Sequence, residues 1–298
     1  MTQRTALVQT QAVWLVLFAG CLSLLPIAPP LQMLAIALCM YLFTKTHLLL
    51  LDRAEGKVRS VAEISLWFGA WPGLNTRFFE KQKTSAIPVE EWLAAIAKIW
   101  IGIFFFLVVA PILVPIQPYV ACWSAMIGFA MTLHFGLIHL LALFFRKQGR
   151  SVNAIMSRPL LATTISEFWG KRWNLAFRDY AHRTLFSPVS KTFGPKAALI
   201  TGFAFSGLIH EFAISLPAHG GYGLPTLYFA LQAAALLLEK RLKHLGLSLS
   251  GNLAGRLWCT CWLVIPAPFL LFHGPFVSEV VQPIVEFVAY YLYGIPYA

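Results

Sequence analysis

The chain has few charged residues, and acidic ones are the scarcer kind. Only 12% of its 298 residues are Asp, Glu, Lys or Arg, about half the fraction usual in soluble domains. Hydrophobic residues make up 58%, and several apolar runs approach the roughly 20 residues that a helix needs to cross a bilayer. The composition therefore excludes an ordinary soluble domain and predicts an all-α, polytopic transmembrane helical bundle.

Cysteine and glycine-rich signatures are also scarce. The five cysteines lie in apolar runs, and none has the C-x-x-C spacing of a structural zinc site, so we expect neither a disulfide framework nor a metal site. The sequence contains no Walker loop, no dinucleotide-binding fingerprint and no G-x-S-x-G elbow, and it therefore lacks the common signatures of nucleotide binding and serine hydrolysis.

Apolar runs recur along the whole chain, so we expect one membrane domain over residues 1–298. A shorter run at 61–71 is more typical of an interfacial or re-entrant helix. The sequence predicts eight spans, at residues 11–27, 31–50, 92–114, 119–145, 197–216, 224–239, 257–273 and 276–296.

The 23 basic residues alternate with these runs. Arg4 precedes the first run, seven residues including Lys45 are assigned to the second connection, ten lie within 146–196 and four follow the sixth run. Only Lys98 remains inside a run, near enough to its end for the ammonium to reach the interface. By the positive-inside rule, this alternation places both termini in the cytoplasm. It also explains the net charge of +11 without a nucleic-acid partner, and a basic face attracts anionic lipids and anionic soluble molecules.

The stretch from Leu161 to Tyr180 has apolar residues at three- and four-residue steps, which predicts one amphipathic helix over 161–180. Its polar stripe would hold Asn174 among charged groups, with Glu167 and Lys171 as an i,i+4 pair in the favourable order. From periodicity alone, this is an interfacial helix with its aromatic rings at the level of the lipid headgroups.

The run 197–216 carries His210 and Glu211 well inside it, where ionisable groups are costly and usually functional. His210 could be a buried histidine held by one interhelical hydrogen bond, or a neutral imidazole acting as a general base. Glu211 lies about 100° further round the helix, so the two do not form a side-by-side pair. A proton-coupled carrier of a lipid or small molecule could also use them as a relay.

Two linked motifs within residues 166–211 resemble the wax synthase-like branch of the membrane-bound O-acyltransferase (MBOAT) superfamily. The first is E-F-W-G-K-R-W-N at 167–174, and the second is S-G-L-I-H-E at 206–211. Asn174 and His210 are 36 residues apart, close to the separation usual in that family. The motif-bearing core spans about 160–216, and the N-terminal half shows no comparable resemblance.

The resemblance implies an MBOAT-like bundle that transfers an acyl group from acyl-CoA to the hydroxyl of a lipophilic alcohol, with no metal or redox cofactor. It makes His210 the catalytic base and Asn174 its catalytic partner. Lys171, Arg172 and Arg178 become candidates for the phosphates of CoA. The full set of implied substrate-binding residues is Trp169, Lys171, Arg172, Trp173, Arg178, Ser206 and Glu211.

Two expectations follow about where the chain sits. Its compact length and short termini favour a bacterial inner membrane over the endoplasmic reticulum. The charge pattern places Asn174 on the cytoplasmic side and His210 roughly 20 Å further along its own helix. For the two to meet, the 161–180 helix must dip into the bundle, or a chamber must open deeply from the cytoplasm.

Overall fold

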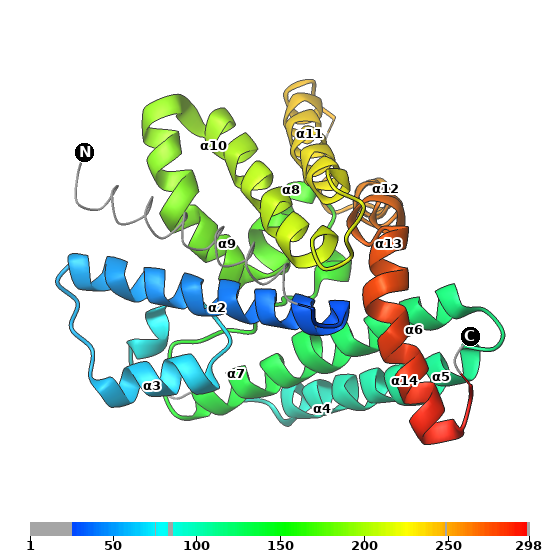
Figure 1. The fold of residues 1–298 in the computed structure, drawn as a ribbon. Helices are drawn as coiled ribbons and strands as arrows, with labels where there is room; N and C mark the ends of the chain where they lie inside the picture. Colours follow the sequence, from blue (N-terminus) through cyan, green and yellow to red (C-terminus); the bar gives the residue numbers. More distant parts are fainter. Residues whose placement is uncertain (1–25, 75, 83–85, 248, 297–298) are drawn as a thin grey trace.

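The computed structural model describes residues 26–74, 76–82, 86–247 and 249–296, which fold into a bundle of helices (Figure 1). This part of the chain has no strand, only an isolated bridge between Lys81 and Arg150, so the all-α prediction is confirmed. The N-terminal half contains α2 (Pro29–Ala54), α3 (Val61–Ala70), α4 (Val89–Phe104), α5 (Ala110–Leu113), α6 (Pro118–Ala130) and α7 (Ile138–Lys147). The C-terminal half contains α8 (Ile165–Glu167), α9 (Leu175–Ala181), α10 (Ser187–His210), α11 (Leu224–His244), α12 (Leu253–Leu263), α13 (Gly274–Phe276) and α14 (Gln282–Tyr293).

Short π-helical turns join many of these helices into longer runs. They lie at Phe105–Val109, Met131–Leu137, Phe168–Arg172, His182–Phe186, Glu211–Ser215, Ala267–Leu271 and Val277–Val281. Five runs in the described part are long and apolar enough to cross a membrane: Pro29–Ala54, Val89–Leu113, Pro118–Lys147, Leu175–Ser215 and Leu253–Leu271. The multi-span membrane fold is therefore confirmed.

The count of eight spans stays a prediction. The first predicted span, 11–27, lies outside the described residues. Residues 224–239 form part of α11, and 276–296 fall largely on the run from α13 to α14, but neither is among the five spanning runs. The orientation of the termini also stays a prediction.

The assignment of Lys45 to a connection is wrong, because Lys45 lies inside α2 and is fully buried. Its ammonium donates to the carbonyls of Trp67 and Trp71, and the Tyr41 hydroxyl donates to the carbonyls of Phe68 (3.3 Å) and Trp71 (3.1 Å). The last carbonyls of a helix lack partners within it, and here α2 supplies donors to the end of α3. Lys45 therefore fixes α3 and adds nothing to the basic face.

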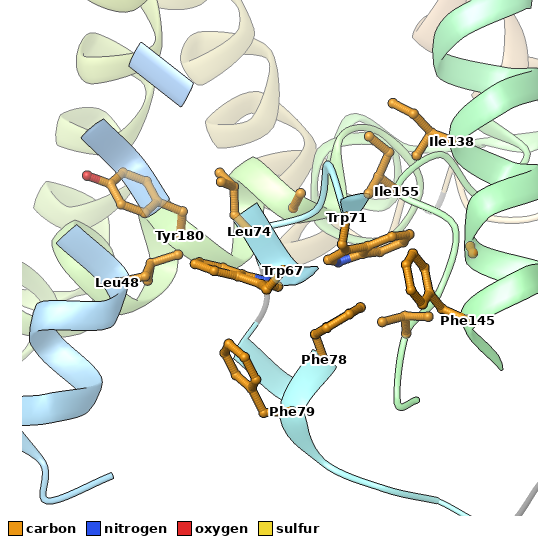
Figure 2. Close-up of a cluster of buried hydrophobic side chains, with 13 residues drawn as sticks. Leu48, Trp67, Trp71, Leu74, Phe78, Phe79, Ile138, Phe145, Ile155 and Tyr180 are labelled. Atoms are coloured by element: carbon orange, nitrogen blue, oxygen red, sulfur yellow. The ribbon is translucent and has the colours of Figure 1, made fainter. Parts of the chain in front are cut away.

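A cluster of buried aromatic rings joins this N-terminal part to the motif-bearing segment (Figure 2). Trp71 stacks on Phe78 with ring centroids 6.3 Å apart, and Phe78 meets Phe145 of α7 edge-on at 5.0 Å. Tyr180 of α9 belongs to the same cluster, and its hydroxyl hydrogen-bonds His47 of α2 at 2.9 Å. The cluster therefore holds α9 against α2, α3 and α7.

The run Leu175–Ser215 is a helical hairpin. Gly194 has φ 84° and ψ 166°, outside the helical region, and Pro195 follows it, so the helix breaks there. The chain rises from α9 to this bend and returns through the second part of α10 (Figure 1). Phe177 of the first arm stacks on Phe205 of the second, with centroids 6.0 Å and planes 6° apart, so the two arms pack antiparallel.

The single amphipathic helix predicted over 161–180 is wrong. Helix α8 runs into a π turn, Trp173 is extended (φ −105°, ψ 130°), and α9 begins only after Asn174, which has φ 38°. Two caps cause the break, because the side chains of Thr164 and Asn174 accept hydrogen bonds from the backbone of Glu167 and Phe177. Side-chain acceptors of this kind start a new helix where apolar periodicity alone would continue the old one.

Candidate active site

The helical hairpin brings the two motif ends to the same level. Asn174 precedes Phe177 by one turn on the first arm, and His210 follows Phe205 by five residues on the second. Because Phe177 and Phe205 stack, a rise of 1.5 Å per residue puts Asn174 about 4.5 Å and His210 about 7.5 Å beyond that stack, toward the same end. The depth difference expected from a straight helix therefore disappears, because the chain doubles back at Gly194.

The imidazole of His210 is held by its own helix. Its Nδ1 lies 2.7 Å from the carbonyl oxygen of Ser206, and a carbonyl only accepts, so Nδ1 carries the proton and Nε2 keeps its lone pair. No protein group in the described part of the chain hydrogen-bonds Nε2. The ring packs on Phe229 of α11 at 4.6 Å. Ser206 uses its hydroxyl on Gly202 (3.0 Å), so it contributes to this arrangement through its carbonyl.

The side-chain amide of Asn174 has a fixed orientation. Its Oδ1 accepts from the backbone N–H of Phe177 at 3.2 Å, so the two N–H donors of Nδ2 point away from the cap. These donors have no protein acceptor in the described residues. The left-handed backbone at φ 38° is one that asparagine adopts more readily than most residues. Asn174 thus uses Oδ1 to cap α9, while the N–H groups of Nδ2 have no protein acceptor in the described residues.

Aromatic rings pack together next to His210. Trp169 contacts Phe203 of α10 at 5.9 Å and Phe229 of α11 at 5.6 Å, and its indole N–H donates to Gln232 at 3.4 Å. Phe229, which contacts the imidazole, is therefore packed against Trp169, and these contacts fix Trp169 in place. Its predicted contact with substrate stays a prediction.

Trp173 packs on the opposite side, toward α7. It stacks on Phe168 at 5.3 Å and meets Phe135 edge-on at 6.1 Å. Its position immediately before Asn174 ties the motif to the π-helical turn that precedes α7.

Glu211 holds the next helix in place. Its carboxylate accepts from the backbone N–H groups of Gly223 (3.1 Å) and Thr226 (2.9 Å) and from the Thr226 hydroxyl (2.8 Å). The first N–H groups of a helix lack partners within it, so Glu211 caps α11 across the hairpin junction. The predicted contact between Glu211 and substrate stays a prediction, and the structure gives this carboxylate three protein donors.

Helix α11 carries site-supporting residues that the sequence analysis missed. Glu239 accepts from the backbone N–H groups of Ile165 and Ser166 (3.1 Å for Ser166), which caps α8 from another element. Gln232, fully buried, receives the Trp169 N–H and donates to the carbonyl of Trp262 at 2.7 Å. The sequence could have indicated both residues, because Gln232 and Glu239 are polar, lie seven positions apart on an apolar helix and therefore share a face.

Two of the three predicted phosphate contacts are engaged with protein groups. Arg172 pairs with Glu167, with Nη2 2.6 Å from Oε1. Because the chain forms a π turn here, the residue five positions after Glu167 lies opposite it, and Lys171, four positions after it, does not. Arg178 donates to the carbonyl of Gly170 (2.8 Å) and pairs with Asp179 (2.6 Å). Lys171 is exposed. The assignment of CoA phosphates to these residues stays a prediction.

Glu167 is the centre of this arrangement. Its carboxylate accepts from the backbone N–H of Thr163 at 2.9 Å and from the Arg172 guanidinium. The Thr163 N–H, followed by Arg172, holds the pKa of Glu167 below its usual 4.5, against the opposing effect of partial burial. The carboxylate is thus ionised at neutral pH and fixes the π turn. Among the described residues, no three His, Cys, Asp or Glu side chains gather to hold a metal.

Comparison with known proteins gives the class to which this site is similar. Residues 152–231 match the model of the membrane bound O-acyl transferase family, a stretch that includes both motifs. The resemblance to that superfamily is therefore confirmed on the residues that carry it, within an all-α membrane fold.

The particular relatives are plant acyltransferases. The chain is 31% identical over 108 residues to a probable long-chain-alcohol O-fatty-acyltransferase 1 of Arabidopsis thaliana, covering 32% of this chain and 31% of the relative. It is 35% identical over 71 residues to a long-chain-alcohol O-fatty-acyltransferase of Simmondsia chinensis (21% and 20%). It is 36% identical over 62 residues to acyl-CoA–sterol O-acyltransferase 1 of Arabidopsis thaliana (18% and 18%). The chain thus covers less than a third of each of these relatives, and the wax synthase-like branch is the one they support.

Proposed function

We propose that this protein is a membrane-embedded O-acyltransferase that moves an acyl group from acyl-CoA to the hydroxyl of a lipophilic alcohol. One observation carries the proposal. Nε2 of His210 and the amide donors of Asn174, which have no protein partner in the described residues, lie at the same end of one helical hairpin. A base and a hydrogen-bond donor thus occur at the same level of the bundle.

In the proposed step, Nε2 of His210 takes the proton of the acceptor hydroxyl as its oxygen attacks the thioester carbonyl. The Asn174 amide donates to the carbonyl oxygen, where negative charge develops. The C–S bond then breaks, and the thiolate of CoA leaves with the proton that His210 returns. An ester and free CoA result, with no change in oxidation state.

The printed names of the relatives support the acceptor class. Two are long-chain-alcohol O-fatty-acyltransferases, and one is an acyl-CoA–sterol O-acyltransferase. The aromatic surface formed by Trp169, Phe203 and Phe229 beside His210 suits a lipophilic alcohol. A carrier that relays protons through His210 and Glu211 gains no support, since Glu211 is occupied by three donors at the start of α11.

The charge pattern supports an orientation for the reaction. With the basic connections in the cytoplasm, both termini lie there, and acyl-CoA would approach from the cytoplasmic side while the alcohol arrives from the membrane. A bacterial inner membrane remains the expected location, although the relatives named above come from plants.

The test is release of free CoA by the purified full chain in detergent, with a panel of acyl-CoAs and with or without long-chain alcohols and sterols. Wild type is compared with His210→Ala and with His244→Ala, which removes an exposed histidine at the end of α11. Alcohol-dependent release should fall by roughly 10²- to 10⁴-fold in His210→Ala and be unchanged in His244→Ala. Retention of most activity by a folded His210→Ala protein contradicts the mechanism.

A further inference from the structure

Two basic side chains, on α4 and α7, face each other across the interface of these helices. The ammonium of Lys98 lies 3.4 Å from Nδ1 of His139. An ammonium only donates, so His139 accepts through Nδ1 and holds its own proton on Nε2 as a further donor. Lys98 is part-buried within the spanning run Val89–Leu113, where a lysine is rare and usually has a specific partner.

Arg158 adds a second full charge to this pair. It interacts electrostatically with Lys98, and it is an exposed residue. Its backbone is left-handed, with φ 47°, directly before Pro159. Such backbone is uncommon outside glycine and clusters at functional sites. The Arg158 carbonyl accepts from Arg172 at 3.1 Å, which fixes this residue against the first motif.

Within the described residues, no ion pair balances the charge of the cluster formed by Lys98, His139 and Arg158. The carboxylate of Glu91 interacts with His139, but it pairs with Arg146 at 3.1 Å. Neither Lys98 nor Arg158 has a carboxylate within ion-pair distance in the part of the chain that the structure describes. Like charges held together in a partly apolar environment are unfavourable unless a negative group joins them.

This basic cluster lies next to the reaction centre proposed above. His139 stands one turn after Phe135 on the same helical face, and Phe135 contacts Trp173 at 6.1 Å. Trp173 in turn precedes Asn174. An anion bound by the cluster is therefore held beside the first motif, on the approach to Asn174.

We propose that Lys98, His139 and Arg158 bind a phosphate group of the acyl donor, the coenzyme A portion of an acyl-CoA. This proposal rests on the proposed function and assigns the phosphate to residues outside both motifs. A phosphate accepts charge-assisted hydrogen bonds from all three donor types. The guanidiniums of Arg172 and Arg178 already serve Glu167, Asp179 and backbone carbonyls. In the described residues, by contrast, no carboxylate pairs with Lys98 or Arg158.

The experiment compares two thioester donors with the same acyl chain, acyl-CoA and the phosphate-free acyl-pantetheine. The variants are Lys98→Met, which keeps the apolar stem, and Arg158→Asn, which tolerates left-handed backbone. Lys243→Gln, at an exposed position of α11, is the control for loss of one positive charge. The ratio of KM for acyl-CoA to KM for acyl-pantetheine should rise roughly 10-fold or more in each cluster variant and not in the control.

Binding of coenzyme A to the purified protein, measured by calorimetry, separates this proposal from the proposed function. Weaker binding in both cluster variants supports the site even if no alcohol is acylated. Equal KM changes for both donors, or coenzyme A binding unchanged in the variants, overturn it. An unchanged KM ratio together with a new dependence on anionic phospholipid in both variants assigns the cluster to a lipid headgroup and also overturns it.

Discussion

The side chains of His210 and Asn174 each use one hydrogen-bonding atom on the scaffold, and the other atom has no protein partner among the described residues. Nδ1 of His210 is tied to the Ser206 carbonyl, and Oδ1 of Asn174 to the Phe177 N–H. Because each bond fixes both the ring or amide plane and the position of its protons, the free base and the free donors are held in place before any substrate binds. This is the preorganisation that lowers the barrier of a polar reaction.

The two roles of Asn174 are separable by substitution. Asn174→Asp keeps an oxygen that caps α9 and a side chain that accepts left-handed backbone, but it removes both amide donors and adds a negative charge. We expect near-normal thermal stability with acyl transfer lowered by roughly 10²- to 10³-fold. Activity close to wild type would show that the amide donors have no role in the reaction, and a large fall in stability would show that the cap was misassigned.

Glu167 predicts a pH dependence of stability. Its folded-state pKa is below 4.5, so its contribution is present above the unfolded value and is lost as the pH falls through the folded pKa. Wild type should exceed Glu167→Gln in melting temperature at pH 7, and the difference should shrink below about pH 4.5. Tryptophan fluorescence during heating in detergent measures this, and a difference independent of pH is the contrary result.

At the scale of the elements, α11 positions the site although it carries neither motif. It receives a cap from Glu211, packs Phe229 against His210, hydrogen-bonds Trp169 through Gln232 and caps α8 with Glu239. Both motifs are therefore fixed relative to one another through a third helix. Close approach of α10 and α11 is required for these contacts.

Gly207 is what allows that approach. A Cβ at Gly207 would lie 2.8 Å from the Cα of Thr226, whereas a Cβ at Gly202 on the same helix would meet nothing within 4 Å. Gly207→Ala should therefore destabilise the protein by about 1–3 kcal/mol and lower activity by displacing α11. Gly202→Ala should be neutral or stabilise by up to about 1 kcal/mol. Melting temperatures and acyl transfer of the two variants measured together decide this, and equal effects would contradict it.

At the scale of the whole molecule, an ion-pair cluster joins the end of α2 to the first arm of the hairpin. Arg183 lies 2.8 Å from Asp52, which is 1% exposed, and 3.0 Å from Glu55. Together with the aromatic cluster around Trp71 (Figure 2), this links the N-terminal half to the motif-bearing core.

Removing Arg183 tests that link. Arg183→Met leaves Asp52 buried with only Lys57 and Arg59, both at 3.6 Å, so we expect a loss toward the lower end of about 3–5 kcal/mol. Arg53→Met removes an exposed arginine of the same helix and should change stability by less than about 0.5 kcal/mol. Thermal unfolding of both variants is the measurement, and similar melting temperatures for the two would contradict the expectation.

The membrane class, most of the spans in the described part and the two motifs could be predicted from the amino-acid sequence alone. Apolar runs of spanning length have few alternatives to a helix, because backbone groups in hydrocarbon must be satisfied within the segment. Composition therefore predicted α2, the run from α4 to α5 and the run from α6 to α7. The motif resemblance likewise singled out Asn174 and His210 before any packing was known.

How these parts meet depends on packing between segments that are distant in sequence. The bend at Gly194 places Asn174 and His210 at one level, and the cap at Asn174 breaks the helix that periodicity predicted across it. Lys45 is buried because the end of α3, distant in sequence, presents carbonyls to it. Periodicity reports the apolar character of each position along one helix. Caps, bends and buried charges depend on partners that only packing brings within hydrogen-bond distance.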